Sequence, residues 1–121
     1  MPRPVLDESR IHPAIRDRVA TQHLDIVKEV QAAVAAHAVV VVGMGINPMP
    51  KRARAALNAA GVSHTYLEFG NYLNHWRRRN ALKMWTGWAT FPMVFVKGTL
   101  VGGATDVEKL IASGELKTLL A

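Results

Sequence analysis

The most suggestive site for chemistry in this sequence lies between a hydrophobic run and a helix-forming segment. The run AVVVV at residues 38–42 leads into the turn GMGINPMP at residues 43–50, and the segment after it is rich in alanine and basic residues. A strand that runs into a helix N-terminus is a common place for a nucleophile or an anionic ligand, because the free backbone N–H groups there favour negative charge. Asn47 and its neighbouring prolines contain no nucleophile. The turn therefore has the position of a reactive site without a reactive group.

The composition limits the chemistry further. The chain contains no cysteine, so disulfides, thiolate metal sites and every mechanism in which this chain supplies the thiol are excluded. Its five histidines show no ligand spacing, and we expect no metal site. Asparagine is among the best N-cap residues, and proline is accepted in the first helical turn. We therefore expect Asn47 to begin a helix.

The formal charge of +6 is concentrated in the middle of the chain. Residues 47–83 contain one acidic residue, Glu68, and seven basic ones, namely Lys51, Arg52, Arg54, Arg77, Arg78, Arg79 and Lys83. Such a surface suits an anionic ligand or an acidic partner, or it only keeps the protein soluble, and both alternatives stay open. Tryptophans among these arginines would also suit stacking on nucleic acid. Trp85 and Trp88 can equally be core residues, and we do not expect a nucleic-acid partner.

The length of 121 residues, half of them hydrophobic, predicts one domain with its own core. Residues 1–13 contain three prolines and are expected to form an arm before a single domain at residues 14–121. The sequence has no apolar stretch long enough to cross a membrane and no signal-peptide pattern at its start. We therefore expect a cytoplasmic protein without a membrane segment.

Hydrophobic spacing and turn residues predict the order of helices and strands. Residues 14–37 are expected to form a long or broken helix, and further helices are expected at residues 50–60, 73–85 and 104–121, the last divided by Gly114. Thr105 is the expected N-cap of that last helix, with Glu108 completing a capping box. Strands are expected at residues 38–42, 62–69, 93–96 and 99–101. The first two strands are separated by a helix and the last two by a tight turn, which predicts a mixed four-stranded sheet flanked by helices.

Three short motifs carry a resemblance to a known family. They are WATFP at residues 88–92, VGGATD at residues 101–106 and SGEL at residues 113–116. In this order and at these separations, the chain from residue 24 onward resembles the glutaredoxin family. The resemblance implies an α/β thioredoxin-like fold, here with an extra N-terminal helix.

The resemblance also implies a groove for glutathione. Its expected residues are Thr90, Phe91, Pro92, Gly103, Thr105, Asp106 and Arg79. A cis bond before Pro92 would expose backbone groups of Thr90 or Phe91 to the cysteinyl part of the ligand. The glycines at 102 and 103 would allow close approach, and the helix start at Thr105 and Asp106 would receive the γ-glutamyl end. Arg79 would contact the glycine carboxylate.

The same resemblance shows what the turn has lost. Without a gap, Asn47 falls at the nucleophilic cysteine of the family, Pro50 at its second cysteine or serine, and Met44 at its lysine. Asn47 cannot ionise or attack sulfur, so no thiolate chemistry of its own is expected. A [2Fe–2S] cluster shared by two protomers would lose two of its four sulfur ligands, and we expect none.

Three functions stay open from the sequence. The first is a catalytically silent module that binds glutathione, or a glutathionylated or acidic protein, as a monomer or weak dimer. The second is a glutathione-dependent oxidoreductase or transferase of redox homeostasis, in which bound glutathione supplies the only thiol. The third is a domain whose basic residues dock an acidic partner.

Overall fold

A four-stranded sheet forms the centre of the computed structural model, which describes residues 3–71 and 73–121. The strands β1 (Val39–Gly43), β2 (Thr65–Glu68), β3 (Met93–Val96) and β4 (Thr99–Gly102) are ordered β2-β1-β3-β4. β1 pairs in parallel with β2 and antiparallel with β3, and β3 pairs antiparallel with β4. The expected mixed sheet is confirmed, with a helical connection between its parallel strands and a tight hairpin between β3 and β4.

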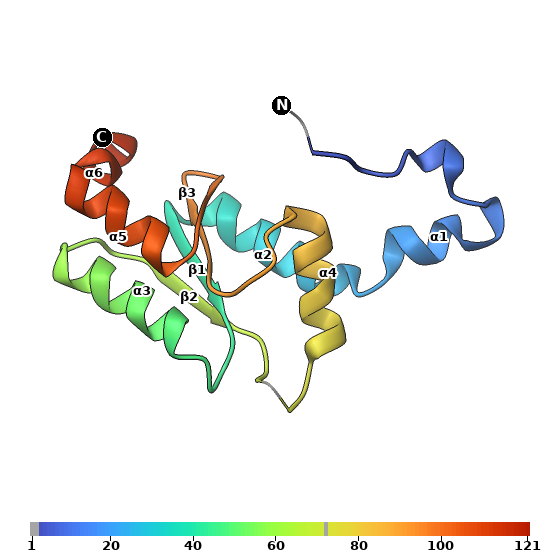
Figure 1. Ribbon diagram of the computed structural model, residues 1–121, viewed down its shortest axis with the longest axis horizontal. Coiled ribbons are helices and arrows are strands. Elements are labelled where there is room, and N and C mark those ends of the chain that lie inside the picture. Colours follow the sequence, from blue (N-terminus) through green and yellow to red (C-terminus); the bar gives the residue numbers. More distant parts are fainter. Residues whose placement is uncertain (1–2, 72) are drawn as a thin grey trace.

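Helices cover both faces of this sheet (Figure 1). α2 (Leu24–Ala36) and α4 (Trp76–Thr86) pack over one face, where Val40 and Val42 of β1 enter the core. α3 (Pro48–Ala59), α5 (Ala104–Ser113) and α6 (Glu115–Leu120) cover the other face, where Val39 and Val41 are buried. A strand buried on both faces explains the unbroken valine run, because each successive side chain meets a different layer. The α/β thioredoxin-like fold is thus confirmed.

The N-terminal region lies outside these layers. A short turn of 3-10 helix, η1 (Glu8–Arg10), precedes α1 (Pro13–Thr21), and no residue of α1 is buried. The helix expected at residues 14–37 is broken, because His23 adopts a left-handed backbone conformation with φ 49°. α1 projects away from the sheet in Figure 1. The boundary between arm and domain at residue 13 stays a prediction. No helix in the described ranges is long and apolar enough to span a bilayer.

The helix expected from residue 73 begins three residues later, at Trp76. Asn71 Oδ1 accepts a hydrogen bond from the backbone N–H of Leu73 at 2.8 Å, and Asn74 Oδ1 accepts from the N–H of Asn71 at 3.0 Å. Such local bonds offer the backbone an alternative to helical pairing, which is why asparagine favours turns. The segment before Trp76 is a connection rather than a first helical turn.

The prediction that Thr105 is the N-cap of α5 was wrong. Gly103 occupies the cap position, and Asp106 Oδ2 accepts a hydrogen bond from the Gly103 N–H at 2.9 Å. Glu108, expected to complete the capping box, instead pairs with Arg52 at 2.6 Å. The helix begins earlier because an aspartate three residues after Gly103 satisfies the cap N–H, which is the second half of a capping box.

Tyr66 on β2 lies between α3 and the end of its own strand. The guanidinium carbon of Arg54 lies 4.2 Å from the ring centroid, and the Tyr66 hydroxyl donates to Glu68 Oε1 at 2.9 Å. Burial, together with the hydrogen bond to Glu68 and its negative charge, raises the pKa of Tyr66 to about 12. The folded protein therefore holds this phenol proton at a pH where the unfolded chain has lost it.

We expect the free energy of unfolding to fall as the pH rises from about 10 to about 12, because the unfolded chain binds fewer protons in that window. Below it, both states hold the proton and Tyr66 contributes no pH dependence. Urea unfolding of wild type and Tyr66→Phe at about pH 9 and about pH 11 tests this expectation. The wild type should lose more stability than the variant, and equal losses would show that Tyr66 is not the responsible group.

Candidate functional site

A groove of 440 Å³ lies where the starts of α3 and α5 meet the loop before β3. Its polar side chains come from three separate segments and from α4, so that groups far apart in the sequence face one space. The lining residues are Met44, Asn47, Met49, Lys83, Trp88, Ala89, Thr90, Phe91, Pro92, Gly103, Ala104, Thr105 and Asp106. Its size and the few polar groups on a largely apolar wall are typical of small-molecule sites.

Asn47 connects two walls of this groove. Its Oδ1 accepts from the backbone N–H of Met49 at 3.0 Å, and α3 begins at the next residue, Pro48. The prediction of an asparagine N-cap is confirmed. Its Nδ2 donates to the carbonyl of Phe91 at 3.4 Å, which joins the helix start to the loop before β3. Both polar atoms of the amide therefore have structural partners.

The loop before β3 turns sharply at its proline. The Phe91–Pro92 peptide bond is cis, and both side chains are buried, while Thr90 is exposed. The start of the loop is held by Thr86, whose Oγ1 accepts from the Trp88 N–H at 3.0 Å and donates to the Leu82 carbonyl at 2.8 Å. The backbone at Thr90 and Phe91 thus lies at the surface of the groove on a fixed support.

The third wall is the start of α5. Gly102 has φ 116°, and a Cβ placed there would lie 2.5 Å from Asp106 Oδ2. Only glycine leaves room for the carboxylate to reach the Gly103 N–H. The first N–H groups of a helix have no partner within it, and the helix dipole makes this end positive. The site therefore places a carboxylate next to groups that attract an anion, which suits a ligand bearing both charges.

Lys83 is a groove residue that the sequence did not identify. It reaches the groove from α4, and its Nζ lies 5.8 Å from the centroid of the Phe91 ring. Met44, at the family's lysine position, is 5% exposed and packs into the core as it lines the groove. The groove therefore contains a cation from α4, although residue 44 is a methionine. No sequence signal pointed to Lys83, because its position depends on how α4 lies against the sheet.

Arg79 lies elsewhere. It is 5% exposed, and its Nη1 donates to the carbonyls of Phe69 and Asn74 at 3.1 and 2.6 Å, which fixes the connection between β2 and α4. It is not among the described residues that line the groove. The other six residues expected from the resemblance, Thr90, Phe91, Pro92, Gly103, Thr105 and Asp106, lie together there.

Several of the basic residues between 47 and 83 contact acidic or aromatic side chains. Arg52 pairs with Glu108 at 2.6 Å, and Arg78 pairs with Asp25 at 2.8 Å. Arg54 lies over the Tyr66 ring, and Arg77 lies 5.1 Å from the centroid of Trp76. Among the described basic residues, Lys83 alone lines the groove. These four arginines thus have side-chain partners outside the groove.

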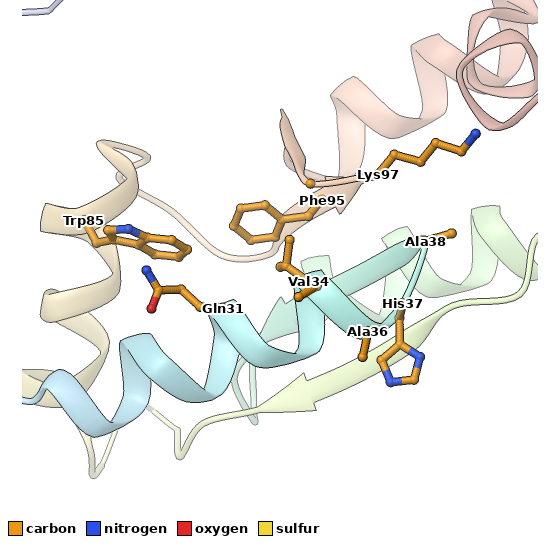
Figure 2. Close-up of a pocket in the computed structure, with 10 residues that line it drawn as sticks. Gln31, Val34, Ala36, His37, Ala38, Trp85, Phe95 and Lys97 are labelled. Carbon is orange, nitrogen blue, oxygen red and sulfur yellow. The ribbon is translucent and has the colours of Figure 1, made fainter.

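A second hollow, of 570 Å³, lies between the end of α2 and the β3–β4 hairpin. Figure 2 shows Trp85, Gln31, Val34 and Phe95 around it, with His37 and Lys97 extending away. The Trp85 and Phe95 rings stack with centroids 6.1 Å apart, which is a packing contact within the fold. The hollow is larger than the groove but has few polar groups converging on it. We therefore place the functional site in the groove.

Comparison with known proteins agrees with this geometry. The family model for glutaredoxin matches residues 48–101. A glutaredoxin-like protein of Dictyostelium discoideum is 40% identical over 102 residues, which cover 84% of this chain and 83% of that protein. The chain belongs to the glutaredoxin family. The crystal structure of oxidized glutaredoxin 2 from Chlamydomonas reinhardtii has a TM-score of 0.70 at 30% identity, covering 81% of this chain and 92% of the other.

A further structural relative shows the likeness of fold alone. The crystal structure of a buckwheat glutaredoxin–glutathione complex has a TM-score of 0.69 at 22% identity, with 83% of this chain and 91% of the other covered.

The groove residues do not fit an iron–sulfur cluster. Such clusters are held by thiolates, and Asn47 at the family's cysteine position offers an amide oxygen that already accepts the Met49 N–H. Within residues 3–71 and 73–121, no group of three histidine, aspartate or glutamate side chains is placed to hold a metal ion.

Proposed function

We propose that this protein binds glutathione in the groove and performs no thiol–disulfide exchange with its own residues. The observation that carries the proposal is the convergence of six expected contact residues on one groove, in which Asn47 serves as a helix cap. A member of the glutaredoxin family that keeps the groove and lacks cysteine keeps a place for the ligand and loses the nucleophile.

Each end of glutathione has a matching wall. The α-carboxylate of its γ-glutamyl end suits the free N–H groups at the start of α5, and its ammonium suits the carboxylate of Asp106. The peptide part suits the backbone at Thr90, which is exposed, next to Phe91, whose carbonyl is already bonded to Asn47. Lys83 is the cation available to the glycine carboxylate, in place of Arg79. The glutathione in the related buckwheat structure supports this choice of ligand.

The groove supplies no general base or nucleophile at Asn47, because both polar atoms of the amide are used in the fold. We propose that glutathione, or the glutathionyl group on another protein, is held rather than transferred. Reduction of hydroxyethyl disulfide by glutathione should therefore proceed at the same rate with and without the protein. A rate above that background would favour the alternative in which bound glutathione supplies the reacting thiol.

Replacing Asp106 tests the ligand contact directly. Asp106→Asn keeps an acceptor for the Gly103 N–H but removes the charge that suits the ligand ammonium, so we expect glutathione affinity by calorimetry to fall roughly tenfold or more. Asp25→Asn is the matched control, because Asp25 pairs with Arg78 outside the groove. It should bind as the wild type does. Equal affinities of Asp106→Asn and wild type would contradict the proposed orientation.

A further inference from the structure

The wall of the groove next to Asn47 is apolar. Met44 is 5% exposed, Phe91 is 6% exposed, and Met49 is half-buried at the start of α3. These side chains line the same groove as Asn47, and Asn47 reaches the Phe91 carbonyl directly. A ligand whose peptide part lies along Phe91 therefore has its cysteinyl side chain next to Asn47 and the two methionines.

No group on this wall is available for a strong polar interaction with a free thiol. The Asn47 amide accepts from Met49 and donates to Phe91, and no ionisable side chain stands at residue 44. In the proposed function, Lys83 pairs with the glycine carboxylate of glutathione, so it is not available to the thiol. A thiol that is desolvated by packing against this wall forms no strong hydrogen bond that would compensate for the lost contacts with water.

An apolar group on the ligand's sulfur would be stabilised by packing against the same wall. Moving alkyl surface out of water is favourable in proportion to its area, and the flexible methionine side chains adapt to the shape of such a group. A groove of 440 Å³ that is open to solvent leaves room for a substituent.

We propose, resting on the proposed function, that the groove selects S-substituted glutathione, a thioether with an apolar group on sulfur, over glutathione itself. The ligand class is a γ-glutamyl peptide whose sulfur is already alkylated. The protein recognises it at both charged ends and at the apolar substituent, and no bond is made or broken.

Calorimetry on the full chain with glutathione, S-methylglutathione and S-hexylglutathione tests this inference. The expected order of affinity is hexyl above methyl above unsubstituted, with at least a roughly tenfold difference between the extremes. Met49→Gln should remove most of the gain in affinity of the hexyl conjugate over glutathione. Met84→Gln is the matched control, since Met84 is 67% exposed on α4 and does not line the groove. It should leave all affinities unchanged.

The outcomes separate this inference from the proposed function. If glutathione binds and the hexyl conjugate gains nothing, the inference fails and the proposed function stands. If the hexyl gain survives Met49→Gln, or falls equally in Met84→Gln, the substituent does not lie on this wall and the inference fails. If no member of the series binds, both fail.

Discussion

Asn47→Cys should create a thiol that reacts faster than an ordinary cysteine. The new side chain would stand at the start of α3, where the helix dipole and the Met49 N–H, no longer bonded to Asn47 Oδ1, stabilise a thiolate, in a groove that already contains Lys83. We expect its pKa to lie below that of an unperturbed cysteine. Alkylation by iodoacetamide at about pH 6.5 should be roughly tenfold faster or more than at a cysteine placed at the other end of the helix.

Asn58→Cys is that comparison, because Asn58 is an exposed residue in the last turn of α3, where the helix dipole disfavours a thiolate. Adding Lys83→Met to Asn47→Cys should slow alkylation, since the groove's cation is removed. Equal rates for the two single variants would mean that the start of α3 no longer faces a site able to support thiol chemistry. In that case residue 47 would serve only as a helix cap, and its surroundings would not lower the pKa of a thiol.

Gly102→Ala should have the largest effect on stability among substitutions at the groove. A Cβ at this residue would lie 2.5 Å from Asp106 Oδ2 and 2.9 Å from Asp106 Cβ, so the carboxylate would have to leave the Gly103 N–H. The φ of 116° adds a backbone cost that only glycine avoids. We expect a loss of roughly 3–5 kcal/mol in urea unfolding and a loss of glutathione binding.

Gly98→Ala separates the two causes. Gly98 also has a positive φ, 82°, but a Cβ there has no heavy atom within 4 Å. This variant should cost only about 1–2 kcal/mol and leave glutathione binding unchanged. Combining Gly102→Ala with Asp106→Ala should cost less than the sum of the two single changes, because alanine at 106 removes the carboxylate that the new Cβ would meet at 2.5 Å and leaves only the Cβ at 2.9 Å. A strictly additive pair would show that crowding at Asp106 is not the cause.

The elements that could be predicted from the sequence are those whose pattern is local. The valines before Gly43 indicate a strand buried on both faces, and Asn47 followed by Pro48 indicates a helix start, because both depend on neighbouring residues alone. The starts of α4 and α5 were misplaced, because they depend on side-chain bonds made by Asn71 and Asp106 that compete with ordinary caps.

The residues of the candidate site also fall into two groups: those that a local motif predicts and those whose position depends on tertiary packing. The groove contacts on Thr90 to Pro92 and on Gly103 to Asp106 follow from two short motifs, each contained in one loop. The sequence did not indicate that Lys83 lines the groove, or that Arg79 lies outside its described lining and donates to the Phe69 carbonyl. Both residues lie on α4, whose placement is not a local property of the sequence. Arg79 and Lys83 are four residues apart and share one face of α4. Which of them reaches the groove therefore depends on where that helix lies along the sheet, which is set by its packing against α2 and the sheet.

The central claim is that a groove without a cysteine still binds glutathione. The most direct measurement is a titration of the isotopically labelled protein with glutathione to about 10 mM, followed by nuclear magnetic resonance, since about millimolar affinity corresponds to only about 4 kcal/mol of binding free energy. We predict shift changes confined to the groove, with the largest at the backbone amides of Thr90, Phe91, Thr105 and Asp106. No change at this concentration, or changes centred on Gln31, Ala38 and Gly98 of the second hollow, would contradict the claim.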